Sequence, residues 1–444
     1  KLCLSLWAQT DAHMTEEFLQ YVWENTLFDT RHCFSTAGKA IEIVHPGYKN
    51  RDAGPDFFNA KVKIDGMTHV GNVEIHQRGS DWFRHGHHVD AAYDNVILSV
   101  VAVADEDVFS SKGRPIDGMV LAYNTHLWDE YAYLQGLTEI PRCSHLLRQG
   151  DSALTSMALT GYAVERLEAK CRVIQEMLDE TKNDWETCFY RLLARYWSGS
   201  VNAEPFSLLA RSLPYKIVLK CADNLARIES LVFGVSGLLA GCAEDDYVAA
   251  MRQEYEFQAS KWRLSSMNPA SWKFARVRPM SFPTVRLALF AALMPRFNAL
   301  VSAVLESSSL EEVERLLDVR ASIYWDTRYK LGVPSVRHVK QLGQAMKEIV
   351  IINAVIPFLF VYGKGRGEEA YCDKAITWLE ALPAERNYIT EGWERAGVVL
   401  SSALQSQAVI QLKKEYCDAH RCLQCKFFSN AFRRQEQGTG RERS

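Results

Sequence analysis

Two patterns of apolar residues divide the chain near residue 140. Before that point, apolar and polar residues alternate with a period of two and predict strands over Ala40–Val44, Phe57–Ile64, Thr68–His76, Val96–Ala104 and near Met119–Tyr123. One helix precedes them, Met14–Asn25, with Phe18, Leu19, Val22 and Trp23 on one face. Beyond residue 140 a period of 3.6 predicts helices over Ala153–Thr181, Trp185–Trp197, Ile217–Leu239, Ser281–Leu293, Ser335–Ala354, Glu368–Leu382 and Arg395–Tyr416.

These elements predict an α+β protein with three parts. We expect a small mixed β-sheet domain at 14–140, a mainly α-helical domain at 141–416 and a basic, cysteine-containing tail at 417–444. A β-rich barrel or sandwich would also accommodate the strands. The apolar run Ile349–Tyr362 contains Pro357 and is too short to span a membrane, so it predicts a buried helix. Residues 1–13 are interpreted as an upstream extension, with Met14 as the natural start.

Composition describes an ordinary soluble protein of 444 residues, 48% apolar and 24% charged. The net charge of −3 argues against bulk electrostatic attachment to nucleic acid. Eleven cysteines, an odd number scattered through predicted helices, suit buried thiols in a reducing compartment. These features favour a cytoplasmic location without a membrane partner.

Candidate chemistry begins with Asp56, Glu74 and His76. Glu74 and His76 lie two apart on one predicted strand, so both side chains project from the same face. Asp56 stands at the entry to the preceding strand and is expected to meet them there. Two carboxylates at the rim of a sheet can hold a hard cation, Mg²⁺ or Mn²⁺, and a histidine can act as a base near neutral pH.

The order Pro55-Asp56, then Glu74-Ile75-His76, resembles the active site of the PD-(D/E)XK nuclease superfamily over roughly the first 110 residues. The resemblance implies a restriction-endonuclease-like fold, with Asp56 and Glu74 holding Mg²⁺. In that superfamily a Lys orients or deprotonates the attacking water, and His76 stands in its place here. An acid from the first helix often joins such sites, which makes Glu24 a further candidate.

A wider set of segments is similar to the bacterial proteins grouped as domain-of-unknown-function family 2851. The segments are Glu42–Gly47, Asn50–Phe57, Val73–His76, Ser80–Trp82, His85–His87, Tyr93–Leu98 and Asn183–Glu186. The similarity extends along the chain to the C-terminal cysteines. It implies kinship and carries no established activity.

The C-terminal cysteines form a second candidate centre. Cys417, Cys422 and Cys425, with His420 between them, place three or four soft ligands within nine residues. This inventory suits a structural Zn²⁺ site, and the three thiols could also hold part of an iron–sulfur cluster. His420 is the first choice for a fourth ligand and Cys372 the second.

Two weaker clusters complete the candidates. His85, His87 and Asp90 offer zinc ligands and would define a metallohydrolase on a β scaffold, although nothing in the spacing marks a third ligand. The second cluster is a candidate groove for nucleic acid. Its cations, Arg276, Arg278 and Arg286, alternate with the aromatic rings of Trp272, Phe274 and Phe282.

Two hypotheses of function follow. The first is a metal-dependent nuclease or phosphodiesterase acting on nucleic acid through Asp56, Glu74 and His76. The alternative is a catalytically inactive scaffold that binds nucleic acid or protein and carries a structural zinc site. The chain contains no phosphate-binding loop, no G-x-G-x-x-G and no G-x-S-x-G, so nucleotide-driven and serine-hydrolase classes lack support.

Overall fold

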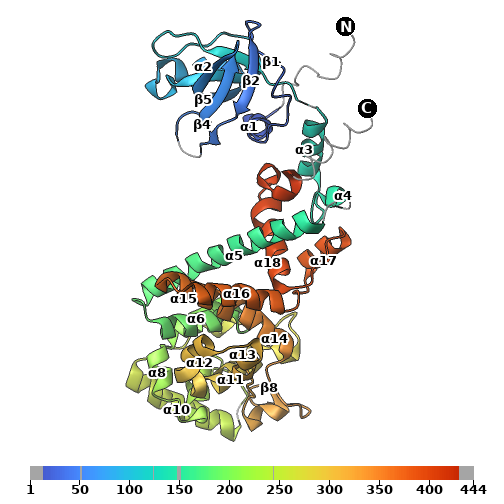
Figure 1. Ribbon diagram of the computed structural model, residues 1–444. Coiled ribbons are helices and arrows are strands. Elements are labelled where there is room, and N and C mark those ends of the chain that lie inside the picture. Colours follow the sequence, from blue (N-terminus) through green and yellow to red (C-terminus); the bar gives the residue numbers. More distant parts are fainter. Residues whose placement is uncertain (1–13, 51–52, 124, 148–151, 244, 430–444) are drawn as a thin grey trace. The chain divides into compact units, whose positions relative to one another are not determined.

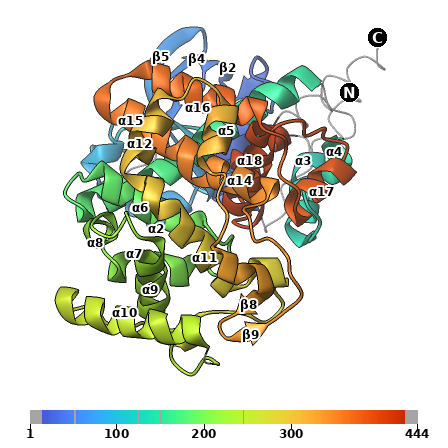
Figure 2. The ribbon, with the colours of Figure 1, turned by 90° about the horizontal axis from the view of Figure 1, so that it is seen from below.

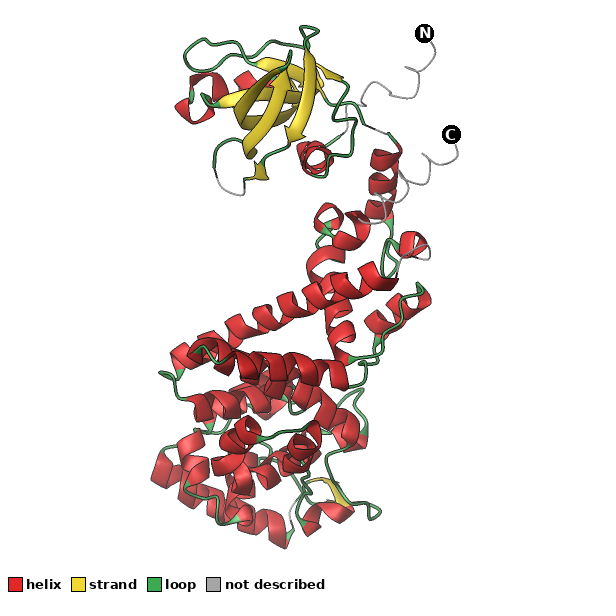
Figure 3. Ribbon diagram, in the orientation of Figure 1, coloured by secondary structure: helices red, strands yellow, loops and turns green. Residues whose placement is uncertain are grey.

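The computed structural model describes residues 14–50, 53–123, 125–147, 152–243 and 245–429 (Figure 1). These residues form a mixed β-sheet near the N-terminus followed by helices, which confirms the predicted α+β class (Figure 3). The interpreted extension 1–13 and the tail beyond residue 429 lie outside the described residues.

The described chain forms two compact units. The first contains the residues up to 158 together with 387–399 and those from 410 onward, and the second contains 159–386 and 400–409. The second unit is therefore inserted into the chain of the first. The sequence-based boundaries near 140 and 416 differ from these because α5 (Ser152–Glu180) runs through the border.

The sheet of the first unit has the order β1-β2-β4-β5-β6-β7, with β3 beside β4. The pairs from β1 to β5 are antiparallel, whereas β6 runs parallel to β5 and β7 runs parallel to β6. The strands are β1 (Cys33–Phe34), β2 (Ala40–His45), β3 (Tyr48–Lys49), β4 (Phe57–Ile64), β5 (Met67–Arg78), β6 (Val96–Val103) and β7 (Asp117–Val120).

Local sequence explains the central hairpin. Ala60, Val62 and Ile64 of β4 alternate with exposed or half-buried residues and are buried. Asp65 and Gly66, which join β4 to β5, both have positive φ (49° and 81°), as a two-residue hairpin turn requires. The turn sets the register that pairs Ala60 with Gly71, and an irregularity between Ala60 and Phe57 shifts it by one residue, so that Phe57 pairs with Val73.

Helix α1 (Glu16–Glu24) contacts β5 through its apolar face. The side chain of Thr15 accepts a hydrogen bond from the Phe18 N–H at 3.3 Å and caps the helix. Phe18, Leu19, Val22 and Trp23 are buried, as the sequence pattern predicts. The other helices of this unit are α2 (Asp81–Arg84), α3 (His126–Gly136), α4 (Ser144–Leu147) and α17 (Tyr388–Arg395).

The second unit is helical apart from a two-stranded ribbon, β8 (Arg328–Lys330) with β9 (Val333–Pro334). In it α15 (Ile356–Arg366) packs against α16 (Glu369–Ala381), and α9 (Leu225–Val235) packs against α10 (Asp246–Trp262) (Figure 2). Besides most of α5, its helices are α6 (Trp185–Tyr196), α7 (Ala203–Ser212), α8 (Tyr215–Leu219), α9 (Leu225–Val235), α10 (Asp246–Trp262), α11 (Pro283–Leu293), α12 (Leu300–Glu306), α13 (Leu310–Leu316), α14 (Gln344–Val350), α15 (Ile356–Arg366), α16 (Glu369–Ala381) and α18 (Ala403–Gln411), which ends in the first unit.

Three predicted helices have different limits in the structure. The segment Ile217–Leu239 is divided, because Asn224 accepts a hydrogen bond from the Arg227 N–H at 3.1 Å and begins a new helix, α9. The segment Ser335–Ala354 is helical only from Gln344. The last predicted helix begins at Ala403 and not at Arg395.

Two stretches, 283–306 and 344–366, are long and apolar enough to cross a membrane, and 56% and 67% of their most apolar windows are buried inside the protein. Core helices show the same burial. In the second stretch a π-helical turn, Ile351–Val355, precedes α15, and Pro357 lies in the first turn of α15. A proline removes a backbone donor from a continuous helix and disturbs its regular hydrogen bonds, which fits the π-helical turn directly before it.

Candidate active site and metal centre

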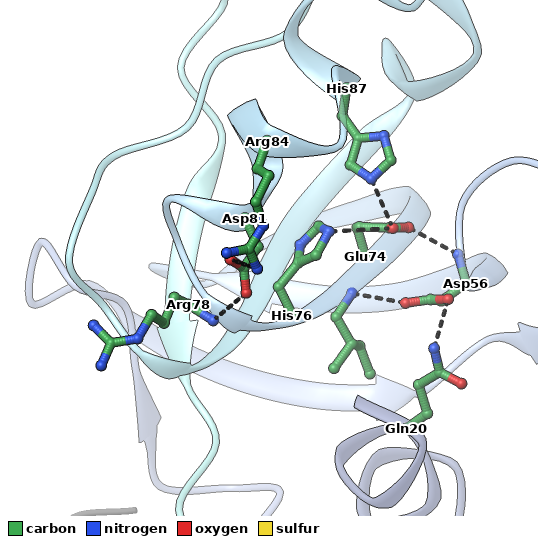
Figure 4. Close-up of polar contacts among 9 residues, drawn as sticks. Gln20, Asp56, Glu74, His76, Arg78, Asp81, Arg84 and His87 are labelled. Atoms are coloured by element: carbon green, nitrogen blue, oxygen red, sulfur yellow. Dashed lines mark hydrogen bonds and ion pairs between the residues drawn. The ribbon is translucent and has the colours of Figure 1, made fainter. Parts of the chain in front are cut away.

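Asp56 and Glu74 meet at the start of β4. The Asp56 N–H donates to Glu74 Oε2 at 2.9 Å, and the Ile75 N–H donates to Asp56 Oδ2 at 2.9 Å (Figure 4). Gln20 of α1 donates its Nε2–H to Asp56 Oδ1 at 2.7 Å. The carboxylates are therefore held in place by backbone and helix donors, and Glu74 Oε1 is left facing away from Asp56.

Charge repulsion marks this pair. Burial, and then the negative charge of Glu74, raise the pKa of Asp56 to about 7, while the hydrogen bonds from Ile75 and Gln20 oppose the rise. When two adjacent carboxylates are both ionised they repel each other, and a bound cation would relieve this repulsion. The arrangement thus favours the binding of a positive ion.

His76 lies beside Glu74 on the same face of β5. Its Nε2 is 3.7 Å from Glu74 Oε1, and its ring is 1% exposed. Within the described part of the chain neither ring nitrogen has a hydrogen-bond partner. Burial, and then the charges of His87, His85 and Arg84, lower the pKa of His76 to about 3, so the ring is neutral. A neutral, buried ring with two unsatisfied nitrogens is a ready metal ligand.

Two further histidines reach His76 from the segment after β5. His85 ends α2, and Gly86 (φ 79°) reverses the chain so that His87 begins a 3₁₀ turn, His87–Val89. One ligand atom from each of His76, His85 and His87 lies within 4.8 Å of the other two. His87 Nε2 is also 3.4 Å from Glu74 Oε1, and its ring stacks on Tyr93 at 3.8 Å. Two candidate clusters of the sequence are therefore one site.

The remaining members of the histidine loop point elsewhere. Asp90, an expected zinc ligand, accepts a hydrogen bond from the Ala92 N–H at 2.9 Å and caps a 3₁₀ turn. The ring of His88 lies 5.2 Å from that of Phe83. The ligand missing from the sequence-based zinc hypothesis is His76.

The spacing of these groups fits one metal ion. Two ligand atoms that each lie ~2.1 Å from an ion are about 3.0–3.4 Å apart. The 3.4 Å and 3.7 Å separations of His87 and His76 from Glu74 Oε1 are close to that range. Three imidazoles and one carboxylate suit Mn²⁺, Zn²⁺ or Fe²⁺ better than Mg²⁺, which prefers oxygen ligands.

Helix α1 contributes Glu16 and Gln20 rather than the expected Glu24. Glu24 contacts Lys49, its carboxylate 3.8 Å from the ammonium group. Glu16 lies close enough to His85 and Glu74 for their charges to act on it, and burial raises its pKa. Glu16, Gln20 and Glu24 recur every four residues, so their spacing alone does not tell which of them reach the site. Sequence reasoning named Glu24 and missed Glu16 and Gln20.

Two arginines flank the histidines. Arg84 forms an ion pair with Asp81, and the Arg78 N–H donates to Asp81 Oδ2 at 3.1 Å, which fastens α2 to the end of β5. The side chains of Arg84 and Arg78 are 70% and 51% exposed, so both can reach an anion in solution. Asp81 itself is buried and occupied by these contacts.

The predicted arginine groove is only partly exposed. Arg276 and Arg278 are exposed. Arg286 turns inward, donates to Ser281 Oγ at 3.2 Å, and burial lowers its pKa. Trp272 is buried and its indole N–H donates to the Ser236 carbonyl at 2.9 Å, so it is a core residue and not a stacking platform. The groove loses two of its expected members.

The C-terminal cysteines lie in the first unit. Cys422 and Cys425 are buried and Cys417 is half-buried. His420, the first choice for a fourth ligand, instead contacts Arg142 and Gln135 through its ring nitrogens. Cys372, the second choice, belongs to the second unit and donates to the Phe360 carbonyl at 3.6 Å.

Together the sheet and the histidine–carboxylate cluster define an α+β protein with a candidate metal site on one face of its sheet. The chain matches the model of the family described as "Protein of unknown function (DUF2851)" over residues 16–388, and it belongs to that family. No curated protein and no solved structure matches the chain.

Proposed function

We propose that the protein is a metal-dependent phosphodiesterase that cleaves nucleic acid at the Asp56–Glu74–His76 site. The observation that carries the proposal is the buried carboxylate pair beside a neutral histidine with two unsatisfied nitrogens. Such a site binds a cation, and a bound divalent ion activates water and stabilises the charge that develops during phosphodiester hydrolysis.

The topology supports the resemblance to the PD-(D/E)XK superfamily. A helix, α1, precedes the antiparallel strands β2, β4 and β5, and β6 then runs parallel to β5. Asp56 stands at the start of β4 and Glu74 and His76 share a face of β5, in the order that the resemblance implies. A restriction-endonuclease-like fold is part of this proposal.

The site assigns its residues to distinct tasks. Glu74 Oε1, His76, His85 and His87 would hold the ion, and Mn²⁺ suits this mixed donor set better than Mg²⁺. Asp56 supplies a second negative charge and, through its N–H, orients Glu74. His76 therefore serves as a ligand in this proposal, and not as the base expected from the sequence.

Substrate binding follows from charge. The phosphodiester is an anion, and the carboxylates of Glu16, Asp56 and Glu74 would repel it without a cation between them. Arg84, which is 70% exposed at the edge of the site, would offer its guanidinium group to a flanking phosphate, whereas Arg78 is paired with Asp105 at 3.5 Å. The whole chain carries a net charge of −3, so this local cation would decide where nucleic acid binds.

Cleavage of nucleic acid should depend on Mn²⁺. Single- and double-stranded DNA and RNA are incubated with the full chain in Mn²⁺, in Mg²⁺ and after chelation, and products are separated by gel electrophoresis. We expect cleavage in Mn²⁺, weaker cleavage in Mg²⁺ and none in chelator, because imidazole ligands favour the transition metal. A protein that binds these nucleic acids but cleaves none with either ion would instead be the catalytically inactive scaffold.

The variant His76→Lys distinguishes a metal ligand from a substitute for the superfamily lysine. An ammonium group has no lone pair to donate, so we expect Mn²⁺-dependent cleavage to fall by more than the roughly 10–100-fold that loss of an outer partner costs. His69→Lys, half-buried on the same strand, is the matched control. Higher activity of His76→Lys in Mg²⁺ would show that His76 replaces a catalytic lysine and would refute the ligand assignment.

A further inference from the structure

A fourth cysteine joins the C-terminal three. Cys417 ends the π-helical turn Leu412–Cys417, Cys422 begins a 3₁₀ turn, Cys425 follows it, and Cys143 directly precedes α4. All four thiols are reduced. All four cysteines belong to the first unit.

Contacts between side chains bring Cys143 to the loop. Arg142, its neighbour in sequence, places Nη1 2.7 Å from His420 Nδ1 and Nη2 3.0 Å from His420 Nε2. Gln135 Oε1 lies 2.8 Å from His420 Nδ1. His420 stands between Cys417 and Cys422, so its ring fastens the Cys143 segment to the cysteine loop. The same contacts occupy both ring nitrogens and remove His420 as a ligand.

Burial makes the group chemically unusual. Cys422 and Cys425 are 9% and 7% exposed, and the ring of the nearby Phe427 packs against Trp393 at 5.3 Å. Cys417 is half-buried. Thiolates that are buried in one place repel one another unless a cation lies between them, and a metal centre supplies that cation.

The spacing of the cysteines selects the kind of centre. Four thiolates can hold one Zn²⁺ or an iron–sulfur cluster. Cys417, Cys422 and Cys425 are separated by four and by two residues, and Cys143 lies far away in sequence. Three ligands with this spacing and a distant fourth cysteine are typical of plant-type iron–sulfur sites.

We infer that Cys143, Cys417, Cys422 and Cys425 together bind one iron–sulfur cluster, with Cys143 as the ligand that the C-terminal motif lacks. The cluster ties residue 143 to the end of the described chain. Every residue of the second unit lies in sequence between Cys143 and Cys417. Holding the two ends of such a long segment together reduces the conformational entropy of the unfolded chain, so the cluster would stabilise the first unit.

Metal analysis of the full chain, purified without oxygen, tests the assignment. We expect iron and sulfide in equal amounts, about two or about four of each per chain, with visible charge-transfer absorption. Cys143→Ser should lose most of the iron. Cys372→Ser and His420→Ala should keep it, because Cys372 belongs to the second unit and His420 is engaged by Arg142.

Three outcomes would overturn the inference. Wild-type protein without iron, or with one zinc per chain, would exclude the cluster. Wild-type iron content in Cys143→Ser would exclude Cys143 as a ligand. Far-UV circular dichroism of each variant separates loss of a ligand from loss of the fold, and the iron content of the wild-type protein tests the cluster without any variant.

Discussion

The variant Glu74→Gln should abolish Mn²⁺-dependent cleavage while the sheet remains folded. Glu74 is the centre of the site, because Oε1 faces His76 and His87 and Oε2 accepts the Asp56 N–H. The amide of Gln keeps the shape and can still accept that hydrogen bond, but it carries no charge for the ion. We expect kcat/KM to fall by more than about 100-fold, beyond the usual effect of an outer-shell change, with a parallel loss of Mn²⁺ affinity measured by calorimetry.

Two matched variants define the size of this effect. Glu24→Gln makes the same change at an exposed acid of α1 that contacts Lys49, and it should leave kcat/KM unchanged. Gln20→Ala removes the Nε2–H donor to Asp56 and should cost about 10–100-fold, as an outer-shell partner does. Wild-type activity and Mn²⁺ affinity in Glu74→Gln would refute the site.

The sheet was predictable because its signals are local. Alternating apolar residues in Phe57–Ile64 and the turn residues Asp65 and Gly66 specify a hairpin without help from the rest of the chain. The same alternation places Glu74 and His76 on one face. Sequence spacing also placed Asp56 at the start of β4, where its N–H donates a hydrogen bond to Glu74.

The full set of candidate metal ligands could not be predicted from the sequence. His85 and His87 reach His76 only because α2 folds back on β5 and Gly86 adopts a positive φ, and no periodic pattern encodes that reversal. Cys143 joins cysteines far along the chain, through the contact of Arg142 with His420. Such long-range proximity depends on tertiary packing, which spacing in one sequence does not report.

The limits of the helices are another feature that the apolar pattern predicts only in part. The overall apolar period over Ile217–Leu239 is helical, and it predicts one helix. The Asn224 cap overrides it, since a side chain that satisfies a free N–H begins a new helix. A polar capping residue inside a periodic segment therefore predicts a helix boundary that the apolar period does not show.

The variant Asp56→Asn should stabilise the metal-free protein at alkaline pH. Burial and the charge of Glu74 raise the pKa of Asp56 from 3.8 to about 7, so the folded state binds this proton more tightly than the unfolded state. The stability that this proton provides is complete below about pH 4 and is lost as pH rises through 7. At about 1.4 kcal/mol per pKa unit, the loss in the wild-type protein is at most about 4 kcal/mol. Asn carries no charge, so the variant avoids this loss of stability.

Hydrogen–deuterium exchange of peptides from β4 and β5 measures this effect within the first unit. In chelator at pH 8, Asp56→Asn should exchange more slowly than the wild-type protein, and the difference should shrink at pH 5 once exchange is corrected for its intrinsic pH dependence. Mn²⁺ should protect both proteins, because the four assigned ligands remain in the variant, and it should protect the wild-type protein more, because there the ion also relieves the repulsion between two carboxylates. Asp107→Asn, at an exposed acid of the same unit, should change nothing. Faster exchange in Asp56→Asn at both pH values would show that the carboxylates do not repel each other, and the electrostatic argument for a bound cation would fail.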